Sequence, residues 1–155
     1  MSKKILLIED DAYVRDLYQT VLKKEGYSVD IAKDGEEALE VVGQGEYNLI
    51  LLDIMLPKLT GIEVLKRLKD EASTKEIPVY LLTNLGDEGI IDEAFKIGAD
   101  GYLLKAKYLP KQVVKEVNKF FLKDSSDKKG EIEEDGEEEN DTEDTEGQVE
   151  IDNLV

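Results

Sequence analysis

Short apolar runs alternate strictly with helical patterns along most of this chain, and that alternation limits the fold more than any other feature. The strand-like runs span residues 4–8, 28–32, 48–52, 77–82 and 101–104. Apolar residues recur at helical spacing over residues 12–25, 35–44, 62–71, 87–97 and 109–123. Because right-handed crossovers join successive parallel strands, this pattern predicts an α/β fold with helices on both faces of one sheet.

The composition of the strand-like runs predicts their order in that sheet. The runs at 4–8, 48–52 and 77–82 are almost continuously apolar, as strands covered on both faces must be. The run at 28–32 contains Ser28 and Asp30, which suits an edge position. We therefore predict a flavodoxin-like (βα)5 fold, a doubly wound parallel five-stranded sheet with the order 2-1-3-4-5.

Charge divides the chain into two parts. Residues 124–155 hold 15 acidic and 2 basic residues, whereas residues 1–123 hold 22 acidic and 18 basic residues. The segment 131–146 has eleven acids and one apolar residue, Ile132, and so cannot bury enough surface to offset its ordering entropy. We predict one folded domain over residues 1–123 and an acidic, disordered tail over residues 124–155. A body this close to charge balance argues against direct nucleic-acid binding.

Two residue types are missing, and their absence excludes several kinds of chemistry. The chain has no histidine and no cysteine. Imidazole catalysis, thiol nucleophiles, disulfides and thiolate metal sites are therefore excluded. No apolar run approaches the length of a membrane span, and the four apolar residues after Lys4 are too few for a signal peptide. We expect a cytoplasmic protein without membrane insertion.

Polar side chains follow directly after four of the apolar runs. They are Glu9, Asp10, Asp53, Thr83 and Lys105. The carboxyl ends of parallel strands meet at one edge of the sheet, where open α/β sheets bind their ligands, so we expect these side chains to converge there. Carboxylates about 4 Å apart repel by about 4 kcal/mol per pair at an effective dielectric near 20, so the three acids indicate a neutralising cation.

The residue types at this edge suit phosphoryl transfer. Oxygen ligands alone favour Mg²⁺, and Mn²⁺ is the alternative. Thr83 can donate a hydrogen bond to an anionic oxygen, and Lys105 can pair with one as a point charge. With Asp53 as a carboxylate nucleophile, the set contains a nucleophile, metal ligands, a cation and a hydroxyl donor.

Four separated motifs resemble the receiver domain of bacterial two-component response regulators. They are ILLIEDD at residues 5–11, LLDIMLP at residues 51–57 with Gly61, Leu82-Thr83, and GYLLK at residues 101–105. The resemblance covers residues 3–123 and leaves the acidic tail outside. It implies that Asp53 accepts a phosphoryl group from a phosphohistidine of a sensor histidine kinase or a histidine phosphotransfer protein.

The resemblance also implies how the metal is held. Asp10 and Asp53 would ligate Mg²⁺ directly, Glu9 would do so mainly through water, and Met55 would contribute its backbone carbonyl.

A further implication concerns the switch. Thr83 would move towards the acyl phosphate, Lys105 would pair with its oxygen, and Tyr102 would turn inward as Thr83 moves. The helix at 87–97, the strand at 101–104 and the helix at 109–123 would then engage an unknown downstream protein. We expect a monomer or weak dimer that acts by docking to that protein or by passing its phosphoryl group on.

Three departures from the family pattern carry predictions. Ala106 stands where proline is usual, so we expect a trans Lys105–Ala106 bond, because a non-proline cis bond costs about 3 kcal/mol. Asn84 stands where a small residue is usual, so we expect it either to crowd the pocket or to donate one more hydrogen bond. Met55 and Leu85 flank the phosphoryl group and are both apolar, so they should exclude or misplace the hydrolytic water. We predict slow self-dephosphorylation.

Structural roles also explain some of these residues. Glu9, Asp10 and Asp11 can serve a helix N-terminus, and we assign only that role to Asp11. Asp53 can form a turn, and Tyr102 can be a half-buried strand aromatic.

Two other functions stay open. One is a non-phosphorylated docking module that works through its acidic tail. The other is an aspartyl-nucleophile phosphatase, which needs a second acid two residues after the nucleophile, where this chain has Met55. We therefore expect no enzyme turnover beyond the protein's own phosphorylation and dephosphorylation.

Overall fold

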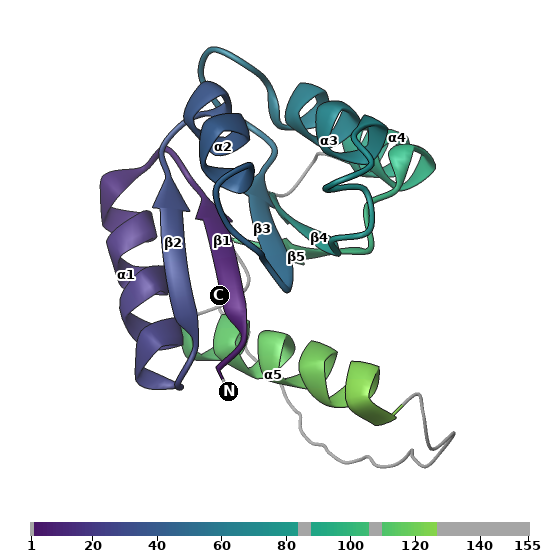
Figure 1. Ribbon diagram of the computed structural model, residues 1–155. Helices are drawn as coiled ribbons and strands as arrows, with labels where there is room; N and C mark the ends of the chain where they lie inside the picture. The colour runs from purple at the N-terminus through teal and green to yellow at the C-terminus, as the bar shows by residue number, and fades with distance from the viewer. Residues whose placement is uncertain (1, 84–87, 106–109, 127–155) are drawn as a thin grey trace. The chain divides into compact units, whose positions relative to one another are not determined.

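The fold is a parallel sheet with alternating helices, as the alternation predicts. The computed structural model describes residues 2–83, 88–105 and 110–126 (Figure 1). Within these residues the strands are β1 (Lys4–Ile8), β2 (Ser28–Ala32), β3 (Leu49–Asp53), β4 (Val79–Thr83) and β5 (Gly101–Leu104). The helices are α1 (Ala12–Lys24), α2 (Gly35–Val42), α3 (Gly61–Asp70), α4 (Glu88–Ile97) and α5 (Pro110–Ser126). The strands pair in parallel in the order β2-β1-β3-β4-β5, which confirms the predicted fold class and order.

The chain forms two compact units, Met1–Val114 and Lys115–Val155. The first unit contains the whole sheet, four helices and the start of α5. The described part of the second unit is the remainder of α5, where Val117 and Phe121 are buried. The predicted helix ended at residue 123, whereas α5 continues to Ser126. The disordered tail was predicted over residues 124–155; this was wrong for residues 124–126, which belong to α5, and residues 127–155 lie outside the described residues.

The core of the first unit lies on both faces of the sheet. On one face, side chains from β1, β3 and β4 form a buried cluster with residues of α2, α3 and α4. The strand register aligns these side chains, since Leu6 pairs with Ile50 and Ile50 pairs with Val79. The intervening residues Ile5, Leu7 and other apolar side chains are also fully buried, as expected for central strands covered on both sides.

Both ends of β3 and of β4 differ from the predicted ones by one or two residues, and the later start of β4 has a local cause. The predicted fourth strand began at residue 77, but β4 begins at Val79. The Ile77 N–H donates to the Thr74 carbonyl in a turn, and Pro78 has no N–H to donate to a strand partner. Asp53 and Thr83, predicted just beyond their strands, are the last residues of β3 and β4.

Side-chain caps fix where α1, α2 and α3 begin. Asp11 caps α1 by accepting a hydrogen bond from the Val14 N–H at 3.0 Å, which is the role the sequence predicts for it. Asp34 caps α2 in the same way, and Thr60 and Glu63 form a capping box at the start of α3. Helices α1 and α2 therefore start within four residues of the strands that precede them, whereas α3 follows β3 after a longer loop.

The amino-terminal ends of β4 and β5 are joined by charged side chains. The Lys69 ammonium donates to the carbonyls of Lys75 and Ile77 at 3.1 and 3.0 Å. The Asp100 carboxylate accepts from the Val79 N–H at 2.9 Å and lies 3.8 Å from the same ammonium. The turn between α4 and β5 is thereby attached to the connection between α3 and β4.

In the parts of the chain that the structure describes, no helix has the length and apolar character needed to cross a bilayer.

Candidate functional site

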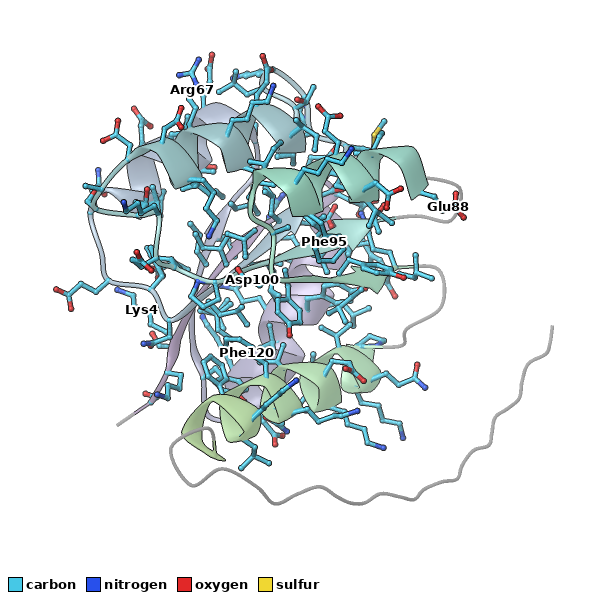
Figure 2. The ribbon with its side chains drawn as sticks, turned by 90° about the vertical axis from the view of Figure 1, so that its right-hand side faces the viewer. Lys4, Arg67, Glu88, Phe95, Asp100 and Phe120 are labelled. Carbon is cyan, nitrogen blue, oxygen red and sulfur yellow. The ribbon has the colours of Figure 1, made fainter. Side chains whose placement is uncertain are left out.

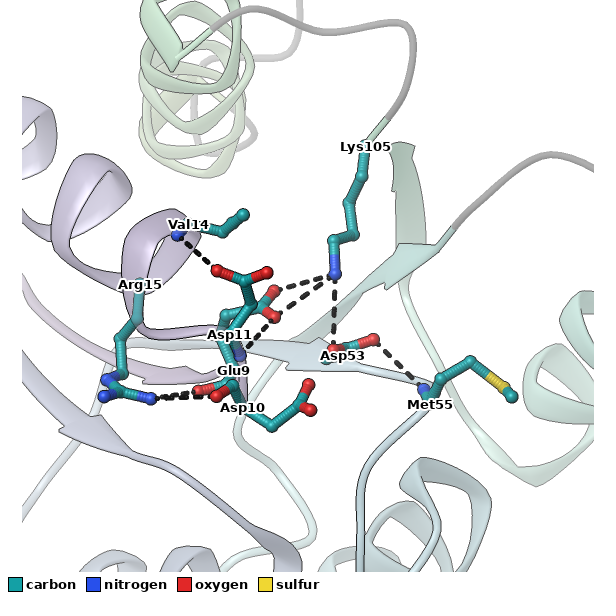
Figure 3. Close-up of polar contacts among 8 residues, drawn as sticks. All are labelled: Glu9, Asp10, Asp11, Val14, Arg15, Asp53, Met55 and Lys105. Atoms are coloured by element: carbon teal, nitrogen blue, oxygen red, sulfur yellow. Dashed lines mark hydrogen bonds and ion pairs between the residues drawn. The ribbon is translucent and has the colours of Figure 1, made fainter.

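Three carboxylates meet at the carboxyl edge of the sheet. One carboxylate oxygen from each of Glu9, Asp10 and Asp53 lies within 4.8 Å of the others (Figure 3). Glu9 and Asp53 are buried, whereas Asp10 is exposed. The structure therefore brings together the acids from two separate sequence motifs, with one open side.

The ammonium of Lys105 lies between the two buried acids. Its Nζ is 3.0 Å from Glu9 Oε1 and 3.3 Å from Asp53 Oδ2 (Figure 3). The backbone N–H of Lys105 donates to the Thr83 carbonyl at 2.7 Å, which fixes the residue at the end of β5. One ammonium group thus partly neutralises two carboxylates that are buried away from solvent.

The strand register brings the acids face to face. Ile8 of β1 pairs with Leu52 of β3, so the residues that follow them, Glu9 and Asp53, are neighbours. Asp53 Oδ1 accepts a hydrogen bond from the Met55 N–H at 3.0 Å, which leaves Oδ2 directed at the Lys105 ammonium. The two oxygens of Asp53 therefore have different environments.

Gly61 allows α3 to begin directly against the end of β3. A Cβ at this position would lie 2.6 Å from the Asp53 carbonyl oxygen and 2.6 Å from Ile54 Cα. The Gly61 N–H also donates to the Ile54 carbonyl at 2.9 Å. Only glycine permits this approach of two backbones, so Gly61 shapes the turn that carries Asp53 and Met55.

Arg15 is a site residue that the sequence analysis missed. Its Nη1 donates to the carbonyls of Glu9 and Asp10 at 2.9 and 3.4 Å (Figure 3). These bonds hold the loop that presents the two acids. A base five residues after an acid pair is too common to have identified Arg15 without the path of that loop.

Burial sets the protonation of Asp53. Loss of hydration raises its pKa from 3.8 to about 7, and the neighbouring Glu9 charge acts in the same direction. Lys105 and the Met55 N–H lower the pKa, but they do not outweigh burial.

Burial acts on the pKa of the Lys105 ammonium in the opposite direction. Burial alone would lower its pKa, but the hydrogen bond to Glu9 and the Asp53 charge outweigh burial and raise it. Lys105 is therefore a firm positive charge beside a carboxyl group that resists ionisation.

The donor set fits a divalent metal ion. Three carboxylates face a single ammonium, that of Lys105, which already lies 3.0 Å from the fully buried Glu9 Oε1 and 3.3 Å from Asp53 Oδ2. Hard oxygen ligands with an open side are what Mg²⁺ prefers, because it keeps several waters and takes few protein ligands. Glu9, Asp10 and Asp53 would supply the side-chain oxygens.

The remaining predicted residues lie around this centre. Thr83 is buried at the end of β4, and the Met55 side chain is exposed. Tyr102 of β5 is 44% exposed, which agrees with the half-buried strand aromatic of the structural alternative, and its ring lies edge-on to Phe95 of α4 at 6.2 Å. The predictions for Leu85, for Asn84 and for the Lys105–Ala106 bond fall outside the described residues.

This fold and this site define a class of protein: the chain belongs to the response regulator receiver domain family. The family model matches residues 5–118, which include all the site residues.

Particular relatives support that assignment. The chain is 35% identical over 122 residues to the transcriptional regulatory protein ResD of Bacillus subtilis, and this covers 79% of the chain and 49% of ResD. It is 35% identical over 126 residues to SrrA of Staphylococcus aureus, covering 81% of the chain and 51% of SrrA. The chain thus spans about half the length of the curated relatives it matches.

Solved structures agree with the fold. The chemotaxis response regulator CheY4 of Vibrio cholerae has a TM-score of 0.72 at 28% identity, covering 77% of this chain and 98% of CheY4. The phosphorylated cyanobacterial phytochrome response regulator RcpA has a TM-score of 0.70 at 34% identity, covering 79% and 95%.

Proposed function

We propose that this chain is a phosphoacceptor switch in a two-component or phosphorelay system. A sensor histidine kinase or a histidine phosphotransfer protein would supply the phosphoryl group from its phosphohistidine. Asp53 would receive that group and form an acyl phosphate. The observation that carries this proposal is the position of Asp53, buried at the carboxyl edge of the sheet, close to the carboxylates of Glu9 and Asp10 and 3.3 Å from the Lys105 ammonium.

The reaction is a single displacement at phosphorus. A carboxylate oxygen of Asp53 attacks the phosphorus, the P–N bond to the donor imidazole breaks, and the imidazole leaves. The Lys105 ammonium, 3.3 Å from Asp53 Oδ2, transfers its contact to a phosphoryl oxygen, and the Thr83 hydroxyl donates to another. These residues hold charge and position the reacting group, so the protein consumes its substrate once and does not turn over.

The raised pKa of Asp53 makes the metal part of this proposal. An acid with a pKa of about 7 is only partly ionised near neutral pH, yet only the carboxylate attacks. A bound Mg²⁺ would neutralise the acids, favour ionised Asp53 and screen the incoming phosphate. Glu9, Asp10 and Asp53 would hold the ion with the Met55 carbonyl, and Mn²⁺ would substitute.

The output of the switch would be a change at α4, β5 and α5. Phosphorylation can shift the equilibrium between two conformations of this surface only to the extent that it stabilises one conformation more than the other. Phe95 of α4 and Tyr102 of β5 are both exposed and in edge-to-face contact. A movement of Thr83 would displace these two elements first. A downstream protein would recognise the shifted state, in the cytoplasm and with the switch as a monomer or weak dimer.

Incubation with acetyl phosphate and Mg²⁺ tests this function. Intact-mass spectrometry should show a gain of one phosphoryl group that is absent in Asp53→Ala and when Mg²⁺ is removed. Asp16→Ala is the matched control, because Asp16 is an exposed acid on α1 and should leave the mass gain intact. Continuous phosphate release would favour an aspartyl-nucleophile phosphatase, and an unchanged mass would favour a non-phosphorylated docking module.

A further inference from the structure

Helix α5 carries a row of lysines on one exposed face. Lys115, Lys119 and Lys123 are four residues apart, and all three are exposed. Residues four apart lie one above the other on a helix, so the three ammonium groups cover about 12 Å of its length. Figure 2 shows nitrogen-tipped side chains along one side of α5. These three residues are called the lysine row below.

The lysine row has little internal neutralisation. Lys119 lies 3.6 Å from Glu116, an exposed pair of the kind that contributes little free energy. Among the described residues, Lys115 and Lys123 have no ion pair. From residue 110 to residue 123 the helix holds four lysines and one glutamate. Because residues 1–123 are close to charge balance as a whole, their net charge does not reveal this local positive excess.

The chain itself contains a segment with the opposite charge. Residues 131–146 carry eleven acids and no base, and they begin eight residues after Lys123. Four residues, 127–130, separate the end of α5 from this segment and include Gly130, which suits a reversal of chain direction. At about 3.3 Å per residue, four acidic residues already match the length of the lysine row.

An apolar pair reinforces the match. Leu122 is 68% exposed and lies beside the lysine row, about 20° around the helix from Lys115 on the side away from Lys119. Ile132 is the single apolar side chain among residues 131–146. An exposed leucine beside the ammonium groups thus has a counterpart among the acids.

Helices α2 and α4 offer the acidic segment a poorer surface, whereas α1 carries three bases and one acid and is tested by the control variant below. Helix α2 carries three glutamates and no base, and α4 carries three acids and one lysine. The edge that holds Glu9, Asp10 and Asp53 would repel the segment. Tethering also favours a nearby site, because a short linker keeps the segment at a high effective concentration.

We propose that the acidic segment 131–146 docks along the lysine row of α5 in the same molecule. Ammonium–carboxylate pairs would hold it there, and Ile132 would lie against Leu122. The contact does not depend on phosphoryl transfer. It would make α5 unavailable at low ionic strength to any other acidic ligand.

A spin label tests this contact in the full chain. Because the sequence has no cysteine, Asn140→Cys gives one attachment site for a nitroxide in the acidic segment. A flexible chain that does not dock already keeps residue 140 within about 23 Å of Lys123 on average. The informative quantity is therefore how the signal loss changes with salt concentration and with removal of the lysine charges. The screening length is about 30 Å at 0.01 M salt and about 3 Å at 1 M. The nitroxide should therefore reduce the amide signal intensities of the lysine row about twofold more at 0.01 M salt than at 1 M salt.

Substitutions identify the partner of the segment. Lys115→Gln, Lys119→Gln and Lys123→Gln together should abolish the salt-dependent loss. A control with Lys23→Gln, Lys24→Gln and Lys66→Gln, three exposed lysines on α1 and α3, should retain it.

Three results would overturn the proposal. One is an equal loss at both salt concentrations, and another is an equal loss in both triple variants. The third is a loss that appears when labelled chain is mixed with unlabelled, isotope-enriched chain, since that contact would join two copies. Circular dichroism of each variant checks that α5 remains folded.

Discussion

Asp53→Asn should make the protein more stable at pH 8 and leave its stability unchanged at pH 4. In the folded protein the pKa of Asp53 is about 7, whereas in the unfolded chain it keeps its ordinary value of 3.8. Between these values the folded state binds more protons, so its free energy of unfolding falls as the pH rises from about 4 to about 7. A difference of about three pKa units corresponds to about 4 kcal/mol.

The amide introduced at position 53 keeps the acceptor for the Met55 N–H and removes the buried charge. The contact with Lys105 becomes weaker, so we expect a net gain of about 2 to 4 kcal/mol above pH 7. Urea unfolding at pH 4, 6 and 8 in the absence of divalent metal measures it. Asp16→Asn, on an exposed acid, should give no comparable gain. A variant that is less stable at pH 8, or a gain of equal size at pH 4, would refute the reasoning.

Magnesium should reduce this difference. If Asp53 is a ligand, Mg²⁺ at ten times its dissociation constant raises the unfolding free energy of the unaltered protein by about 1.4 kcal/mol. The same addition should stabilise Asp53→Asn much less.

Three further substitutions test the site. Gly61→Ala should lower the free energy of unfolding by about 1 to 3 kcal/mol, because the new methyl group meets backbone atoms at 2.6 Å. Gly89→Ala in α4 places its methyl group in open space and should raise the free energy of unfolding by about 0.5 to 1 kcal/mol. Equal effects of the two substitutions in urea unfolding would contradict this. Arg15→Ala should cost about 1 to 3 kcal/mol in the same assay through loss of its bonds to two carbonyls, and a change below about 0.5 kcal/mol would argue against it. Met55→Asn should speed decay of the phosphorylated protein in Mg²⁺ about tenfold, a barrier change of about 1.4 kcal/mol, whereas Met55→Leu should not; decay within seconds in the unaltered protein would show that the apolar side chain does not slow hydrolysis.

The apolar periodicity was sufficient to predict the sheet and the edge at which the acids meet. Strands buried on both faces need continuous apolar runs, so the first polar residue after each run marks where a strand leaves the core. That rule located Asp53, Thr83 and Lys105 to within one residue of the strand ends, although Asp53 and Thr83 still belong to their strands.

Features that depend on loop paths were not predictable in this way. Arg15 reaches the carbonyls of Glu9 and Asp10 only because of how the loop before α1 turns, and no local pattern encodes that turn. Lys58 has a φ of 69°, which sequence preference assigns to glycine or asparagine, so its conformation is imposed by the loop between β3 and α3. The lysine row was hidden because a net charge averages over all faces of the body.

The attachment at the amino-terminal ends of β4 and β5 determines how α4 can move. Asp100, three residues after the end of α4, is fixed to Val79 and Lys69, whereas the first turn of α4 follows Thr83 by five residues. A displacement that begins at Thr83 will therefore rotate α4 about its far end instead of translating it. Ten residues give a lever of about 15 Å, so a shift of about 1 Å at the first turn becomes a tilt of about 4°.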